Sequence, residues 1–86
     1  MNELPKYVDL VDPLIQILAE AGKPLSNSEI EAAIIKRMGI PESLTIQIHS
    51  GSRTELQYRL AWARTKAKSS GKIVSTKRET WALKSN

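Results

Sequence analysis

Glycine and proline divide this chain into separate segments, and no other feature constrains its fold as strongly. Gly22 is followed by Pro24 and Gly39 by Pro41, so a helix that reaches either pair ends there. Later in the chain, residues 52–70 contain neither glycine nor proline. The spacing predicts three helices, and 86 residues are enough for one domain, 1–86, with a single modest core.

The first two segments follow a helical period. In "DLVDPLIQILAEAGKP", leucine and isoleucine recur on one face, which predicts a helix over about residues 8–21. Pro13 suits the first turn of such a helix, or the helix begins near Tyr7 and takes this proline into its first two turns. Ser26 and Glu29 have the spacing of a capping box and predict a second helix over about 27–38.

The segment that follows Pro41 is ambiguous. Leu44, Ile46 and Ile48 alternate with polar residues, and this period of two indicates a short strand. Because so few residues are involved, a helical turn and a loop remain alternatives.

The third helix is predicted over about residues 53–70, because Ser52 and Glu55 form a second capping-box pattern. Plotted at 3.6 residues per turn, its apolar residues form one narrow stripe suited to a core. This stripe contains Leu56, Leu60, Ala63 and Ala67. An adjacent polar and basic stripe contains Arg53, Gln57, Arg64 and Lys68, with Thr54, Ala61 and Thr65 beyond it.

After Gly71, two short runs rich in β-branched and aromatic residues predict a β-hairpin over about 72–75 and 80–84. Lys77 and Arg78 lie at its expected tip. Three helices followed by a basic-tipped hairpin predict an α+β, mainly α, fold: a winged helix with a helix-turn-helix core and a C-terminal wing.

Charge is distributed unevenly along the chain. Residues 1–43 carry four Lys or Arg and seven Asp or Glu, whereas residues 44–86 carry nine Lys or Arg and two Asp or Glu. A basic cluster of this kind attracts a phosphate backbone, because neutralised phosphates release condensed counterions. A solvated basic face without a partner is the alternative.

The composition and the residue spacing of the sequence disfavour several classes of function. The chain has no cysteine and one histidine, His49, so no metal or cofactor site is predicted. No Asp or Glu is followed two residues later by Lys, so the D/E-x-K element of one nuclease class is missing, and no enzyme activity is expected. No apolar run approaches the roughly 20 residues of a membrane span, and no signal peptide is recognisable, so we expect a soluble cytoplasmic protein.

The polar stripe of the third helix is the predicted DNA-contacting surface. Arg53 and Gln57 carry planar groups that hydrogen-bond to guanine and adenine edges, and the small Ala61 lets the helix axis approach a groove. The turn before the helix offers backbone N–H groups to phosphate. The candidate DNA-binding residues are Ser50, Gly51, Ser52, Arg53, Thr54, Gln57, Tyr58, Ala61, Arg64, Lys68, Lys77 and Arg78.

Two further residues of this helix are predicted to serve the fold. In a chain without Phe, Trp62 is expected to pack between the third helix and the hairpin or the first helix. Arg59 lies at the edge of the core stripe, where it is expected to hold a carboxylate such as Asp9 or Asp12.

The chain resembles the N-terminal winged-helix domain of Mrr-type restriction proteins. The resemblance spans "LPKYVDLVDPLIQIL", "SGSRTELQYRLAWARTKAKSSG" and "RETWALK". Its most specific part runs from Arg59 to Thr65, "RLAWART", followed by Gly71, which is similar to the family pattern R-(V/I)-G-W-A-R-T…G. The segment "LAEAGKPLSNSEI" is also similar to HARE-type domains, which lack the W-A-R-T element. Lys72 after Gly71, and Glu79 in the wing, depart from the family pattern.

The resemblance implies a double-stranded DNA-binding module of a restriction system, with the third helix in the major groove and the wing on the backbone. It also implies a fused or separate nuclease domain of the PD-(D/E)xK kind as the partner that supplies the chemistry. The alternative is a protein-interaction or dimerisation domain without direct DNA contact, in which the acidic half of one copy meets the basic half of another. A homodimer is therefore an open alternative, and no membrane partner is expected.

Overall fold

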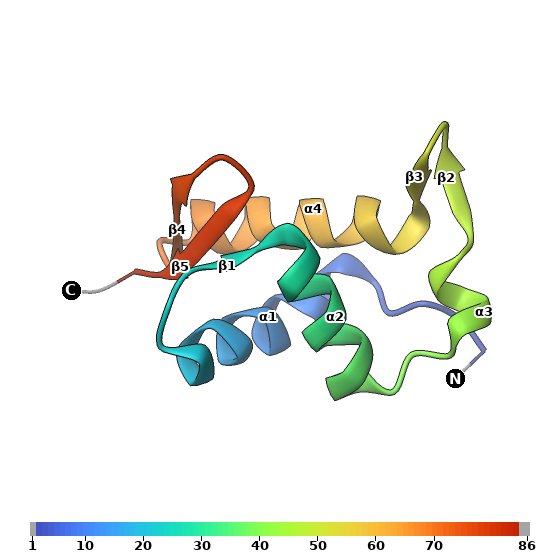
Figure 1. Ribbon diagram of the computed structural model, residues 1–86, viewed down its shortest axis with the longest axis horizontal. Helices are drawn as coiled ribbons and strands as arrows, with labels where there is room; N and C mark the ends of the chain where they lie inside the picture. Colours follow the sequence, from blue (N-terminus) through green and yellow to red (C-terminus); the bar gives the residue numbers. More distant parts are fainter. Residues whose placement is uncertain (1, 85–86) are drawn as a thin grey trace.

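The computed structural model describes residues 2–84 of the chain. Its elements in chain order are α1 (Tyr7–Ala21), β1 (Leu25–Ser26), α2 (Asn27–Met38), α3 (Glu42–Thr45), β2 (Ile48–Ser50), β3 (Arg53–Thr54), α4 (Glu55–Ser69), β4 (Ile73–Lys77) and β5 (Thr80–Leu83). Helix α4 runs along one side of the molecule above α1 and α2, with the β2–β3 hairpin at one end and the β4–β5 hairpin at the other (Figure 1). The prediction of an α+β, mainly helical fold of winged-helix-like form is confirmed.

Helix α1 begins at Tyr7, one residue before the predicted start, and contains Pro13 in its second turn. The second of the two starts considered from the sequence is therefore correct. The helix ends where Gly22 adopts a left-handed conformation, with φ of 65°, and donates its N–H to the carbonyl of Leu18. Glycine adopts this conformation without a steric penalty, which explains the stop.

Helix α2 has the predicted bounds and the predicted capping box. The backbone N–H of Glu29 donates to Ser26 Oγ at 3.1 Å, and the N–H of Ser26 donates to Glu29 Oε1 at 2.9 Å. The two side chains thus satisfy two backbone donors that the helix itself leaves free.

The region after Pro41 differs from the predicted strand. Residues Glu42–Thr45 form the single helical turn α3, and the strand β2 begins only at Ile48. Strand β2 pairs with β3, with Ile48 opposite Thr54. This pairing holds the backbone of Arg53 and Thr54 in an extended conformation, so α4 begins only at Glu55. Its capping box is therefore Thr54 with Gln57, not Ser52 with Glu55.

The core lies where α4 packs on α1. The four residues of the predicted core stripe, Leu56, Leu60, Ala63 and Ala67, are all buried. They meet Leu10, Leu14 and Leu18 of α1 within one continuous apolar cluster. Within residues 2–84, no helix combines the length and apolar character that crossing a membrane requires.

The wing is held against the start of α2. Strand β5 pairs with both β1 and β4 in a three-stranded antiparallel sheet. Trp81 Nε1 donates to Asn27 Oδ1 at 2.8 Å, and the backbone N–H of Asn27 donates to the carbonyl of Glu79 at 2.9 Å. Because β4 extends to Lys77, the turn is shorter than predicted and consists of Arg78 and Glu79.

Replacing Trp81 with Phe keeps a ring in the wing but removes the donor to Asn27 Oδ1, leaving that oxygen without its partner. We expect a loss of about 1–2 kcal/mol in the free energy of unfolding, measured by urea denaturation. The matched control is Trp62→Phe, because the indole of Trp62 forms no hydrogen bond among the described residues and the expected change is below about 0.5 kcal/mol. Equal losses in the two variants would contradict this prediction.

Candidate nucleic-acid interface

The outer face of α4 carries part of the predicted polar stripe. Gln57, Thr65 and Lys68 are exposed, as is Arg53 just before the helix, and Ala61 lies half-buried among them. Both hairpins project past α4 on the same side of the molecule (Figure 1). The outer face of the helix is thus flanked by one hairpin at each end.

The residues Ser50, Gly51 and Ser52 lie in and beside the turn of the β2–β3 hairpin, where all three are exposed. They do not cap α4. The backbone N–H of Glu55 already donates to the carbonyl of Gln47, and that of Gln57 donates to Thr54 Oγ1. These two backbone donors at the start of α4 are therefore used within the fold, and phosphate binding by the exposed turn that precedes the helix stays a prediction.

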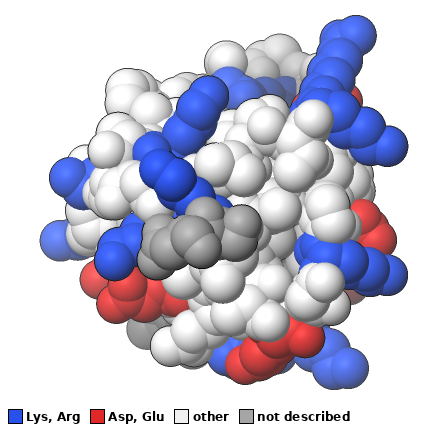
Figure 2. Space-filling model, turned by 90° about the vertical axis from the view of Figure 1, so that its left-hand side faces the viewer, with Lys and Arg blue, Asp and Glu red and all other residues white. Residues whose placement is uncertain are grey.

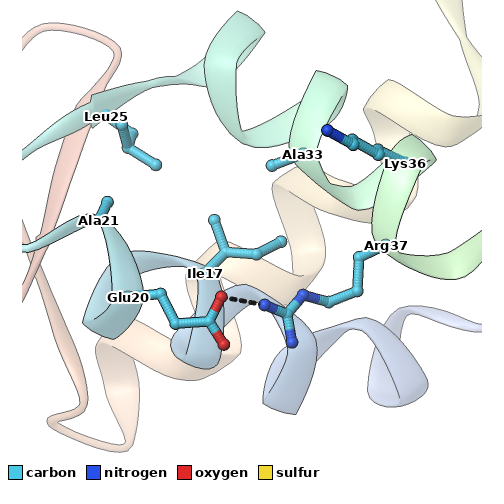
Figure 3. A pocket seen from close by; sticks show the side chains of 7 residues that line it. All are labelled: Ile17, Glu20, Ala21, Leu25, Ala33, Lys36 and Arg37. Carbon is cyan, nitrogen blue, oxygen red and sulfur yellow. Dashed lines mark hydrogen bonds and ion pairs between the residues drawn. The ribbon is translucent and has the colours of Figure 1, made fainter.

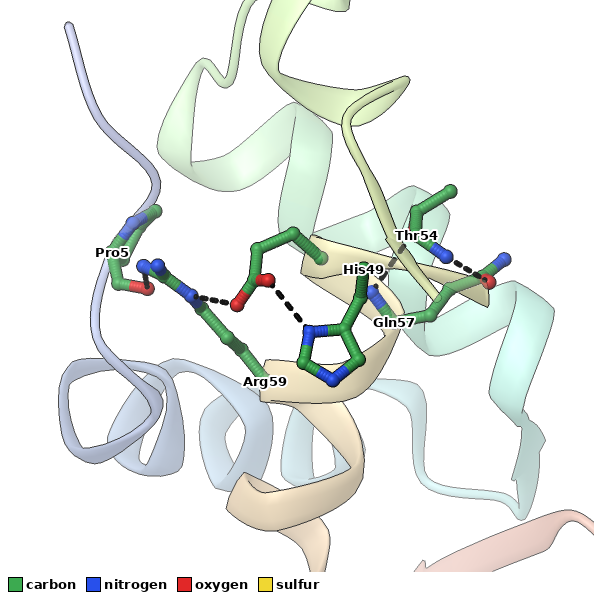
Figure 4. A network of polar contacts seen from close by, with 6 residues as sticks. Pro5, His49, Thr54, Gln57 and Arg59 are labelled. Carbon is green, nitrogen blue, oxygen red and sulfur yellow. Dashed lines mark hydrogen bonds and ion pairs between the residues drawn. The ribbon is translucent and has the colours of Figure 1, made fainter. Parts of the chain in front are cut away.

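A polar network ties the β2–β3 hairpin and the N-terminal segment to α4 (Figure 4). Glu55 accepts from Arg59 Nε at 2.9 Å and pairs with His49 Nδ1 at 2.9 Å. Arg59 Nη1 donates to the carbonyls of Leu4 and Pro5. Arg59 has a structural ion pair as predicted, but its carboxylate partner is Glu55 and not Asp9 or Asp12. The hydrogen bond from Arg59, followed by that from His49, lowers the pKa of the Glu55 carboxyl.

Aromatic side chains line the flank of α4 that adjoins this network. The Tyr58 ring stacks on His49 with centroids 3.8 Å apart, and Trp62 lies 6.3 Å from Tyr7 of α1. Trp62 thus lies beside the first helix, one of the two neighbours predicted for it, but it is 49% exposed and is therefore only partly covered there. The half-buried Tyr58 lies between this flank and the outer face of the helix, because it also lines a hollow with Ala61 and Thr65.

Arg64 does not stand on the exposed stripe where the helical wheel placed it. The residue is only 8% exposed, and its guanidinium carbon lies 5.8 Å from the centre of the Trp81 ring. Lys68 Nζ lies 5.9 Å from the same ring. Burial lowers the pKa of Arg64, and the charge of Arg53 lowers it further. The wing thus covers Arg64, which the sequence pattern could not show.

A polar cavity of about 240 Å³ lies where α2, α4 and the wing meet. Arg53, Gln57 and Arg64 line it from β3 and α4. Its other polar lining residues are Asn27, Ser28 and Glu31 from α2 and Glu79 from the turn of the wing. Sequence reasoning did not identify the three α2 residues, because only tertiary folding brings the start of α2 next to α4.

A larger hollow of about 610 Å³ lies between α1 and α2 (Figure 3). Its floor is aliphatic, with Ile17, Leu25 and Ala33, and the ion pair of Glu20 with Arg37 closes one side. No three His, Cys, Asp or Glu side chains of residues 2–84 gather as metal ligands, here or elsewhere. This hollow thus combines an aliphatic floor with the charged side chains of Glu20, Lys36 and Arg37.

Basic side chains cluster toward the wing. After Thr65, the exposed basic residues are Lys66, Lys68, Lys72, Lys77, Arg78 and Lys84. Figure 2 looks onto this end of the molecule, where Lys and Arg side chains stand out across the upper part and on both sides of the face, while Asp and Glu lie mainly along its lower part and right edge. The basic half of the sequence thus becomes a basic end of the folded domain, with Lys77 and Arg78 at the tip of the wing.

The family comparison matches this chain over most of its length. The model of the Mrr N-terminal domain family matches residues 7–85, the last of which lies outside the described part of the structure. By this match the chain is an N-terminal domain related to restriction systems, and it is not itself a nuclease domain. No significant match was found among curated proteins or solved structures.

The lowered pKa of Glu55 gives a pH-dependent contribution to stability. A carboxyl whose pKa is lower in the folded state stabilises the fold above its unfolded pKa, and this contribution is lost as pH falls through the folded pKa. We expect Glu55→Gln to be less stable than the wild type at pH 7, and the difference to shrink below about pH 4. Urea denaturation at a series of pH values measures it, with Glu42→Gln on α3 as the exposed control. A difference that does not change with pH would contradict the prediction.

Proposed function

This chain belongs to the Mrr N-terminal domain family, and we propose that it is a double-stranded DNA-binding module. The observation that carries this proposal is the outer face of α4, where the polar side chains of Arg53, Gln57 and Thr65 are exposed on a helix that has one hairpin at each end. The second hairpin is the wing with Lys77 and Arg78. A helix flanked in this way suits insertion into a groove with contacts to the backbone on both sides.

The dimensions of α4 suit the major groove. An α-helix with its side chains is about 10–12 Å across, which matches the width of about 12 Å of the groove, and the 15 residues of α4 give it a length of about 22 Å. Ala61, with its small side chain, lies at the middle of the outer face. A close approach of the helix axis is therefore sterically allowed.

Arg53 is the residue best suited to reading a base. Its side chain is exposed, and it borders both the polar cavity and the shallow hollow around Ala61 and Thr65. A guanidinium in this position can donate two hydrogen bonds to guanine. Gln57 is less free than Arg53 to pair with a base, because its Oε1 already accepts from the backbone N–H of Thr54 and keeps one lone pair for a further donor.

The chemistry of restriction would then come from a nuclease domain, either fused to this module or separate from it. Target recognition, including any preference for modified bases, is the role that we propose for α4. Arg78 and Lys77 at the wing tip would hold the backbone without reading sequence.

A binding selection over random and modified duplexes supplies the target for a test of this proposal. On the selected duplex, Arg53→Ala is expected to lose about 1–3 kcal/mol of binding free energy and to lose discrimination at one base pair. Gln57→Glu keeps the capping acceptor but introduces a negative charge, so it should weaken DNA binding without loss of stability. Fluorescence anisotropy measures both effects.

Lys77→Ala should weaken binding to all duplexes alike and reduce the slope of log Kd against log salt by about one. Lys36→Ala on α2 is the matched control, because it removes an equal charge from the hollow between α1 and α2. The absence of DNA binding by the folded domain at low salt would refute the proposed function.

The hollow between α1 and α2 favours a second candidate function, a protein-interaction or dimerisation domain. The hollow is largely aliphatic and lies away from the outer face of α4. Analytical ultracentrifugation with and without DNA separates the two functions. A tight dimer that forms without DNA and is weakened by Ala33→Asp in this hollow would favour the second.

A further inference from the structure

The polar cavity between α2, α4 and the wing contains a guanidinium without a hydrogen-bonding partner. Arg64 lines this cavity and is 8% exposed. Within residues 2–84, no acceptor receives a hydrogen bond from it, and no carboxylate forms an ion pair with it. The face of Trp81 is its close neighbour, and this contact leaves the N–H donors of the guanidinium unused. Every side-chain nitrogen or oxygen of the described residues that is shut off from solvent has a hydrogen-bonding partner, so the free donors of Arg64 reach solvent through the cavity and are available to a ligand there.

Two amide side chains of the cavity also present donors. Asn27 Oδ1 accepts from the indole N–H of Trp81, and Gln57 Oε1 accepts from the backbone N–H of Thr54. An indole N–H and a backbone N–H can only donate, so the orientation of each amide is fixed. Both oxygens are therefore used by the fold, and the NH2 groups of Asn27 and Gln57 remain for a ligand in the cavity that they line.

The start of α2 adds to this set of donors. Ser28, the second residue of a helix of 12 residues, lines the cavity with its hydroxyl-bearing side chain. The N-terminal end of a helix carries a partial positive charge. Arg53 stands at the same cavity and is exposed, so it can close over a ligand.

Two carboxylates of the cavity, by contrast, disfavour the binding of an anion. Glu31 and Glu79 line it and raise the pKa of Arg64, although more weakly than burial and Arg53 lower it. Neither lies within ion-pair distance of Arg64. They partly balance the buried charge in the free protein, and Glu79, exposed in the turn of the wing, would oppose an incoming anion.

We propose that this cavity binds one phosphate group, held by Arg64 and by the NH2 groups of Asn27 and Gln57, and that the group is a phosphate of the DNA backbone. The assignment to DNA rests on the proposed function, whereas the anion site rests only on the geometry of the cavity. Arg64 thus acts as a fixed phosphate anchor next to the groove-facing helix and does not read a base.

The first test titrates inorganic phosphate into 15N-labelled protein, with chloride keeping the ionic strength constant. Saturable shifts are expected for Arg64 Nε–H and for the side-chain NH2 groups of Asn27 and Gln57. Arg64→Met, which keeps the aliphatic packing on Trp81, should abolish the response of the two amides. Lys84→Met removes an equal charge outside the cavity and should leave the response unchanged. If Arg64→Met does not fold, Arg64→Lys provides the comparison, with a several-fold weaker response expected.

Glu79→Gln distinguishes an anion from a nucleobase with an exposed amino group. Removing this carboxylate should tighten phosphate binding several-fold, because it removes a repulsive charge. Weaker binding in Glu79→Gln would overturn the proposal, since it would show that Glu79 attracts the ligand. The absence of a saturable response at Arg64, Asn27 and Gln57 would overturn it as well.

The second test locates the phosphate in DNA. Each phosphate of a bound duplex is replaced in turn by a neutral methylphosphonate, and one position should weaken binding to the wild type but not to Arg64→Met. If inorganic phosphate binds and no duplex does, the anion site stands and the proposed function fails. If duplexes bind but no position is coupled to Arg64, the DNA assignment is overturned while the proposed function stands.

Discussion

The close packing of α4 on α1 is the constraint on which the rest of this structure depends. Only a narrow stripe of α4 is apolar, and two of its members are the alanines Ala63 and Ala67, both fully buried. Small residues allow the helix backbone to approach its neighbours closely, so this one stripe is enough to hold α4 in the core. The remaining circumference of the helix is left for polar and aromatic side chains, which is why a single helix can both complete the core and present a polar face to solvent.

The wing extends this division of roles. Trp81 supplies one ring to three purposes: its edge donates to Asn27 at the start of α2, and its face receives the cations of Arg64 and Lys68. The position of the wing therefore decides which basic residues of α4 stay in solvent and which are drawn into the cavity. The basic residues of the C-terminal half therefore differ in solvent exposure: Arg64 is buried, whereas Lys77 and Arg78 remain exposed.

Patterns local to one segment predicted the fold well, whereas patterns that depend on a neighbour did not. The glycine stops, the core stripe of the third helix and the capping box of Ser26 and Glu29 are local, and all are observed. Ser52 with Glu55 and Thr54 with Gln57 satisfy the same capping rule, and only the pairing of Ile48 with Thr54 selects the second. The burial of Arg64 and the exposure of Trp62 likewise depend on the positions of the wing and α1, and a helical wheel carries no information about those positions.

The acidic residue in the wing, Glu79, takes on a different meaning once the structure is known. In the sequence, Glu79 is an acidic residue beside Lys77 and Arg78, and its negative charge argues against a contact between the wing and phosphate. In the fold its backbone has φ of 54°, its carbonyl accepts from Asn27, and its side chain lines the cavity that contains Arg64. A carboxylate in this position offsets part of the cost of burying a guanidinium without a hydrogen bond, so the free domain can keep that cation in place. The wing thus carries the exposed cations of Lys77 and Arg78 together with Glu79, whose carboxylate lines the cavity. This combination is consistent with anion binding, because Glu79 stabilises the cavity without a ligand while Lys77 and Arg78 lie outside the cavity.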